Sequence, residues 1–104
     1  MIYEMRTYRI KVGMMAQYIE QFERIGLPIV QRYCNLVGYW TTESGELNRV
    51  IHIWEFESAQ QRDEARARWW QDTEWLEDYI PLALPFVDSQ ASILMKAAPF
   101  SPIR

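Results

Sequence analysis

Hydrophobic periodicity switches between two and about 3.6 residues along this chain, and the order of the switches leaves few folds open. Strand-like alternation occupies four segments, Ile2–Ile10, Leu36–Thr42, Val50–Glu57 and Val87–Lys96. Helical spacing fills the chain between the first and second segments and again between the third and fourth. The resulting order, β-α-β-β-α-β, predicts an α+β, ferredoxin-like fold with a four-stranded antiparallel sheet and both helices on one face. A length of 104 residues suits one domain over residues 1–104.

The first helical segment begins near Met14 and carries an apolar residue at every third or fourth position. Pro28 interrupts this stripe, because proline has no N–H to donate to the carbonyl of Arg24. We therefore expect a kink or a short break near Pro28, with helical spacing resuming toward Tyr33.

The second helical segment opens with Ser58 as its N-cap and with Gln61 three residues later, the spacing of a capping box. Ala65 and Trp69 form its apolar side, and Asp72 can cap a further short helix. Three arginines are interleaved with acidic residues, which predicts a solvated helix face for Arg62, Arg66 and Arg68.

Composition excludes several classes of function. The net charge is −3 with acids and bases mixed, so no basic patch suggests nucleic acid, and no apolar run reaches the ~20 residues of a membrane-spanning helix. One histidine and one cysteine, in different elements, make a metal site in a single protomer improbable. We expect Cys34 to be a small buried group and the compartment to be reducing and cytoplasmic.

The sheet face that the helices leave uncovered is the expected functional surface. If the helices need a purely apolar surface beneath them, Ile51 and Ile53 face the helices, as do Tyr3 and Met5. By elimination, the open face carries Glu4, Arg6, Tyr8, His52 and Trp54; the register leaves the direction of Trp40 open. So many aromatic side chains in contact with water would indicate an interface, which predicts a homodimer of two sheets packed face to face.

His52 is the only imidazole in the chain and the centre of the candidate site. It is either a hydrogen-bonded structural group or a ligand contact, and we expect burial beside Trp54 to lower its pKa. Arg6 and Glu4 are either ligand contacts or an ion pair that neutralises itself. Trp40 and Trp54 are either packing groups or platforms on which a ring stacks.

Three segments together resemble the NIPSNAP family. They are "YEMRTYRIKVG", "LVGYWTTESGELNRVIHIWEFES" and "APFSP", so the resemblance extends from Ile2 to Pro102. It implies the dimeric α/β barrel, in agreement with the order of elements. Val12 and Thr73 stand where other members often have proline, and both lie at turn or cap positions.

The resemblance implies a small-molecule-binding protein and leaves two functions open. Related barrels include cofactor-free monooxygenases and isomerases. By that analogy His52 would be the general base on a small aromatic or enolisable substrate, and Arg6 would hold the enolate. Glu4, Tyr8, Trp40 and Trp54 would bind the substrate, with no cofactor and no metal. The alternative is a non-catalytic ligand-binding or assembly module whose polar cluster only fixes a homodimer or a larger homo-oligomer.

Overall fold

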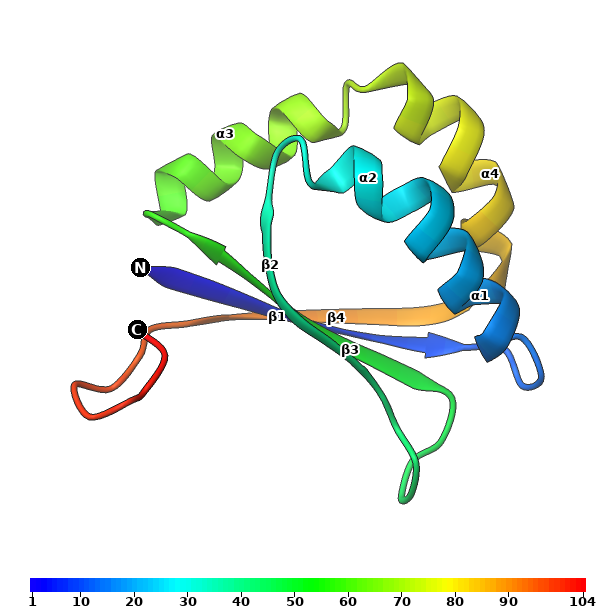
Figure 1. The fold of residues 1–104 in the computed structure, drawn as a ribbon, viewed down its shortest axis with the longest axis horizontal. Coiled ribbons are helices and arrows are strands. Elements are labelled where there is room, and N and C mark those ends of the chain that lie inside the picture. The colour runs from blue at the N-terminus through cyan, green and yellow to red at the C-terminus, as the bar shows by residue number, and fades with distance from the viewer.

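The computed structural model describes residues 1–104 and has the predicted order of strands and helices (Figure 1). The strands are β1 (Ile2–Ile10), β2 (Asn35–Thr41), β3 (Arg49–Phe56) and β4 (Val87–Met95). They form one sheet in the spatial order β2-β3-β1-β4, and every neighbouring pair is antiparallel. The helices arch over one face of this sheet, and the C-terminal tail lies on the other side (Figure 1). The predicted ferredoxin-like α+β fold is confirmed.

Each helical stretch contains a π-helical turn just before a proline. The first stretch comprises α1 (Met15–Gln21), η1 (Phe22–Gly26, the π turn) and α2 (Leu27–Val30). The second comprises α3 (Ala59–Trp69), η2 (Trp75–Tyr79, the other π turn), α4 (Ile80–Ala83) and the 3₁₀ turn η3 (Leu84–Phe86).

The prolines account for the position of these irregular turns. The N–H of Leu27, the residue before Pro28, donates to the carbonyl of Phe22 five residues earlier. The N–H of Ile80, the residue before Pro81, donates to Trp75 in the same way. The regular i→i−4 hydrogen bonding of the helix is thus interrupted just before each proline, because proline has no N–H with which to continue it. The break expected near Pro28 is confirmed, and Pro81 produces a second one.

Side-chain caps begin the second helical stretch as predicted. Ser58 Oγ accepts from the Gln61 N–H at 3.0 Å, and the Gln61 side chain accepts from the N–H of Glu57 at 3.2 Å. The Asp72 carboxylate accepts from the N–H groups of Glu74 and Trp75 at 2.9 and 3.2 Å. These caps satisfy helix N–H groups that have no partner within the helix.

The predicted assignment of the two sheet faces is wrong. In the antiparallel register Arg6 lies opposite His52 and Glu4 lies opposite Trp54, so these side chains share one face. That face is the one beneath the helices: Glu4 is 1% exposed and His52 is 4% exposed. The elimination assumed that helices need a purely apolar surface under them. The polar groups are buried here because other protein groups satisfy their hydrogen bonds.

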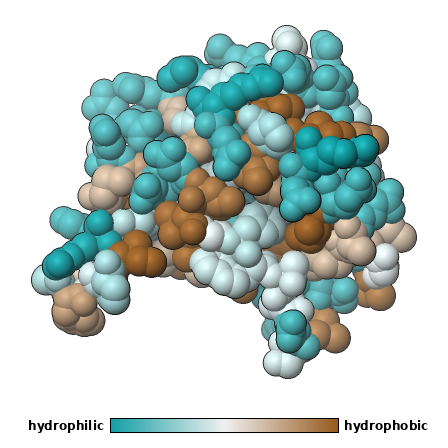
Figure 2. Space-filling view, in the orientation of Figure 1, coloured by the Kyte–Doolittle hydropathy of each residue, from teal (hydrophilic) through white to brown (hydrophobic).

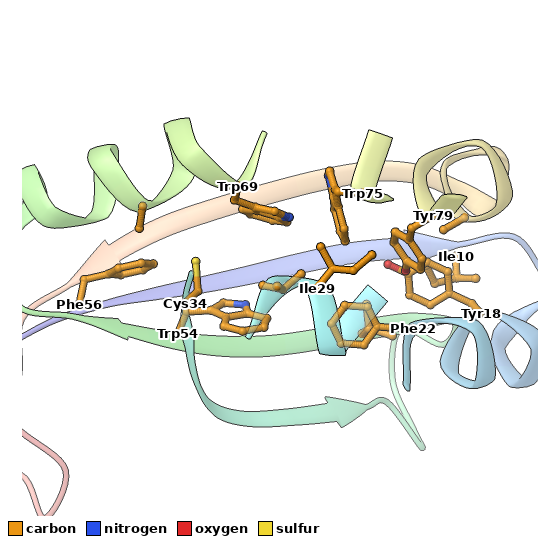
Figure 3. Packing of buried hydrophobic residues seen from close by; sticks show 14 residues of the cluster. Ile10, Tyr18, Phe22, Ile29, Cys34, Trp54, Phe56, Trp69, Trp75 and Tyr79 are labelled. Atoms are coloured by element: carbon orange, nitrogen blue, oxygen red, sulfur yellow. The ribbon is translucent and has the colours of Figure 1, made fainter. Parts of the chain in front are cut away.

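The core between the sheet and the helices is unusually aromatic. Figure 3 shows Trp54 and Phe56 on the strands facing Trp69, Trp75 and Tyr79 from the helices above. Phe22 packs edge-on against Tyr79 with their ring centroids 6.1 Å apart, and Trp75 stacks on Tyr79 at 4.7 Å. Large rigid rings fill space with few rotatable bonds, but they tile a volume less completely than aliphatic side chains do.

The open face of the sheet carries the residues that were expected in the core. Met5 lies opposite Ile53 and Ile93, and Ile51 lies opposite Trp40. Trp40 is 52% exposed and Ile93 is 51% exposed. In the space-filling view the molecule is hollowed below the sheet, whereas the outer surfaces of the helices are mostly hydrophilic (Figure 2).

Two glycines offer a test of how tightly the helices pack. A Cβ at Gly26 would lie 2.7 Å from Tyr79 Cε1, inside the aromatic core, and a Cβ at Gly38 would lie 2.3 Å from the half-exposed ring of Trp40. We expect Gly26→Ala to lower the free energy of unfolding by roughly 1–3 kcal/mol, because the buried ring cannot move away. Gly38→Ala should cost less than about 1 kcal/mol, because the Trp40 ring lies outside the core beneath the helices and has more room to shift.

Urea unfolding followed by tryptophan fluorescence compares the two variants directly. A Gly38→Ala protein that is less stable than Gly26→Ala would contradict the close packing of η1 against Tyr79.

Candidate functional site

A cavity of about 170 Å³ lies between the sheet and the helices. Most of its walls are aromatic, with Tyr39 and Trp54 contributed by the strands and Phe22, Trp75 and Tyr79 contributed by the helical stretches. The two π turns supply three of these five rings, because Phe22 belongs to η1 while Trp75 and Tyr79 belong to η2. Smaller apolar side chains also line the cavity, and its polar and charged members are Glu4, Arg6, His52, Arg66 and Gln90.

Glu4 is the only acidic side chain of the cavity wall, and its carboxylate is fully engaged. It accepts from Arg6 Nη1 at 2.7 Å and from Ser92 Oγ at 2.6 Å. Arg62 reaches it from α3 with two nitrogens, Nε and Nη2, each at 3.0 Å. Burial alone would raise the pKa of Glu4, but the hydrogen bonds from Arg62, Ser92 and Arg6 outweigh burial and lower it to about 2.

Arg6 is likewise held on both sides. Its Nη1 pairs with Glu4, and its Nε donates to the hydroxyl oxygen of Tyr8 at 2.6 Å. The ion pair between Arg6 and Glu4 that the sequence left as an alternative is therefore present. The Arg6 side chain as a whole is 14% exposed, and it lines the cavity while it is paired.

A hydrogen bond from Trp54 fixes the tautomer of His52. The indole Nε1 of Trp54 donates to His52 Nδ1 at 2.6 Å. An indole nitrogen can only donate, so Nδ1 must be the acceptor and the neutral imidazole carries its proton on Nε2. His52 Nε2 is buried and has no hydrogen-bond partner in the protein. His52 therefore offers an N–H donor at the cavity wall.

The surroundings of His52 disfavour its charged form. Tyr39 stacks on the imidazole at 4.7 Å, and the ring of Tyr8 lies edge-on at 4.8 Å. Burial and, to a smaller extent, the charge of Arg6 lower the pKa of His52 to about 3, although Glu4 partly opposes them. The lowered pKa predicted from the sequence is confirmed, and the ring is neutral near pH 7.

Other buried polar groups beside the cavity also have no partner. They are the indole nitrogens of Trp69 and Trp75, whereas the hydroxyls of Tyr39 and Tyr79 lie close enough to the hydroxyl of Tyr18 to interact with it. Burial raises the pKa of both tyrosines, so both hydroxyls stay protonated and can donate. Buried polar atoms without partners are uncommon in proteins, and their concentration here is what a polar ligand atom would satisfy.

The solvated face predicted for the α3 arginines is wrong for two of the three residues. Arg62 is bound to Glu4, and its side chain is 18% exposed. Arg66 lines the cavity and lies over the ring of Trp69, with 5.1 Å from Cζ to the ring centroid. Only Arg68 is exposed as expected. The acidic neighbours that suggested a mixed surface helix lie on the outer side of α3.

The structure brings together five of the six predicted site residues. Glu4, Arg6, Tyr8, His52 and Trp54 all line the cavity, whereas Trp40 lies on the opposite face and does not. Sequence reasoning missed Tyr39 and Arg66. Tyr39 could have been found, because it alternates with Trp40 on β2. Arg66 had no local signal, because its role depends on the packing of α3 over β1.

Neither a metal centre nor a membrane span is part of this structure. It holds no group of three or more His, Cys, Asp or Glu side chains that could bind a metal ion. None of its helices has the length and apolar character needed to cross a bilayer.

The fold and the cavity define a ferredoxin-like domain with an aromatic pocket between its sheet and its helices. The chain belongs to the NIPSNAP family, whose profile matches residues 3–102. It is 33% identical to human Protein NipSnap homolog 3A over 99 residues, which are 94% of this chain and 40% of that protein. The chain thus spans about 40% of the length of these curated relatives.

Solved structures agree with this assignment. A NIPSNAP family protein of unknown function from Agrobacterium tumefaciens superposes with a TM-score of 0.97 at 38% identity, over 100% of this chain and 94% of that chain. A putative antibiotic biosynthesis monooxygenase from Nitrosomonas europaea gives a TM-score of 0.67 at 7% identity, over 93% of this chain and 98% of that chain. The second likeness shows a shared fold alone.

The lowered pKa of His52 predicts how stability depends on pH. Between pH 6.5 and about 3 the unfolded chain binds a proton at His52 that the folded protein does not. The free energy of unfolding should therefore fall as the pH drops below 6.5, by up to about 1.4 kcal/mol per pH unit. Glu4 adds a loss of the same sign only below its ordinary value of 4.5.

Urea unfolding between about pH 7 and pH 5 isolates His52 from Glu4. His52→Gln should flatten the dependence in that interval. NMR titration of the single imidazole should show no protonation there, and a midpoint near the ordinary value would refute the burial argument.

Proposed function

We propose that this NIPSNAP domain binds a small, planar, largely aromatic molecule in the cavity, with His52 as a neutral hydrogen-bond donor. The observation that carries the proposal is the Nε2–H of His52, which is buried, fixed in its tautomer by Trp54 and without a partner. A ligand carbonyl or hydroxyl oxygen that accepts this hydrogen bond would remove the cost of leaving the donor unpaired.

The size and lining of the cavity support a planar ligand. Its volume of about 170 Å³ is close to the ~150 Å³ that accommodates a benzene ring in an engineered apolar cavity. Phe22, Tyr39 and Tyr79 are among the rings that line the cavity, and aromatic pairs favour stacked or edge-on contact. Flat, rigid molecules also lose little conformational freedom on binding.

The same geometry favours a donor role for His52 over the general-base role considered from the sequence. Nδ1 is occupied by Trp54, and Nε2 already carries the proton. The other titratable groups that line the cavity are no better as general bases near pH 7. Glu4 has a pKa of about 2 and is therefore a weak base, and burial raises the pKa of Cys34 to about 11, so its thiol stays protonated. A cofactor-independent monooxygenase or isomerase would therefore act on a substrate that arrives already ionised, with His52 stabilising its oxygen.

The donor role predicts a graded response to substitution at position 52. Asn keeps an acceptor near the place of Nδ1 but no donor near Nε2, whereas Gln can place an amide N–H near Nε2. With benzamide as the probe, we expect His52→Asn to bind roughly 2–10-fold more weakly than the unchanged protein, the loss of one neutral hydrogen bond. His52→Gln should bind with intermediate affinity.

Ligand-observed NMR titration measures these affinities, and the Nε2 shift of the single imidazole reports contact in the unchanged protein. Equal binding by His52→Asn and the unchanged protein, or no benzamide binding at all, would refute the proposal.

We also propose that the open face of the sheet joins two copies of the chain into a homodimer. The apolar side chains Met5, Ile51, Ile53, Trp40 and Ile93 support this, because they share one face and no helix covers them. The hollow below the sheet gives that face a concave outline (Figure 2). Exposed apolar faces of this kind are typical of interfaces. The free, buried thiol of Cys34 fits the reducing, cytoplasmic compartment that forms part of the proposal.

A charge on the open face should separate the copies without unfolding them. Sedimentation velocity at micromolar concentration should show a dimer for the unchanged protein and a monomer for Ile53→Lys. Ala67→Lys, on the exposed side of α3, is the matched control and should stay dimeric. A monomeric unchanged protein, or a dimeric Ile53→Lys protein, would rule out this interface.

A further inference from the structure

We infer that the cavity selects a ligand with one negative charge, an aromatic monocarboxylate, and that Arg66 is the residue that binds its carboxylate. This inference rests on the proposed function, because it names the charge of a ligand that would occupy the same cavity. It is carried by an imbalance between the acidic and basic side chains around the cavity.

The charges around the cavity do not cancel. Glu4 contributes one negative charge, and Arg6 and Arg62 both bind it, while Arg62 also pairs with Asp63 at 3.1 Å. The Arg66 side chain lines the same cavity and forms neither a salt bridge nor a hydrogen bond with another protein group, although its guanidinium lies over the ring of Trp69. Arg6 cannot be released to a ligand cheaply, since Glu4 and Tyr8 hold it on both sides. Arg66 is therefore the guanidinium that remains available.

The position of Arg66 makes an anionic partner favourable. Burial lowers the pKa of Arg66, and the positive charges of Arg6 and Arg62 add to this effect, while Glu4 opposes it. A partly buried cation that is repelled by its neighbours gains from an anion placed against it. The ring of Trp69 supports the guanidinium from one side, which leaves its donors free for a planar acceptor.

The chemistry of one free arginine specifies the anion. A guanidinium offers two parallel N–H donors that match the two oxygens of a carboxylate. One unpaired arginine balances one negative charge, so a monocarboxylate fits better than a phosphate monoester, which carries close to two charges at neutral pH. The Nε2–H of His52 supplies a neutral donor at the same cavity, and the aromatic walls hold the ring.

Benzoate and benzamide separate charge from shape. Both are planar single rings of nearly equal size, and only benzoate is an anion near pH 7. We expect benzoate to bind at least about tenfold more tightly than benzamide, as charge-assisted hydrogen bonds are worth more than neutral ones. Arg66→Gln should weaken benzoate binding more than benzamide binding and so remove this preference, while Arg66→Lys should keep part of it.

Arg68→Gln is the matched control, because Arg68 lies two residues further along α3 and is exposed; it should bind both probes as the unchanged protein does. Thermal unfolding of each variant shows that it is folded before the titrations are compared. If benzamide binds as tightly as benzoate, or if Arg66→Gln retains the preference, the inference about charge fails and the proposed function stands. If neither probe binds, both fail.

Discussion

One buried carboxylate joins three separate parts of this fold. Glu4 lies on β1, one of the two middle strands of the sheet. Its oxygens accept hydrogen bonds from Arg6 on the same strand, from Ser92 on the edge strand β4 and from Arg62 on α3. A carboxylate at 1% exposure would be very costly without these donors. The network therefore fixes where α3 crosses the sheet, and the position of α3 in turn places Trp69 and Arg66 over the cavity.

The same network determines the electrostatics of the site. It neutralises Glu4 with Arg6 and Arg62, so Arg66, the second arginine of the cavity wall beside Arg6, remains unpaired. It also keeps the nearest negative charge occupied, so Glu4 only partly offsets burial and Arg6 at the imidazole of His52. A chain with a net charge of −3 thus encloses a polar pocket wall with an excess of positive charge. Local pairing, and not overall charge, decides what such a pocket attracts.

Features that depend on neighbours in sequence could be predicted, and those that depend on distant partners could not. Pro28 disrupts its own helix and Ser58 caps its own helix, so both were predictable. The faces of the sheet were assigned in reverse because Glu4 and His52 looked too polar to lie under helices. Glu4 can be buried under the helices because Arg62, 58 residues away in the sequence, donates hydrogen bonds to it. Hydrophobic periodicity does not reveal a partner at such a distance in sequence. Alternation still grouped the residues correctly, since side chains on one face of a strand stay together whichever face is buried.

The two faces of the sheet separate the proposed ligand site from the proposed dimer contact. On the sequence-based assignment, one surface would have served both as the dimer contact and as the ligand site, so any substitution there would have affected both. In the structure the polar residues lie under the helices, and the apolar residues Met5, Ile51 and Ile53 lie on the free side. Successive residues of β1 and β3 therefore alternate between the two surfaces. The sheet is thin enough that a ligand on one side and a partner on the other would contact the same strands through different side chains. Two roles can thus be carried by adjacent residues and still be separated by single substitutions.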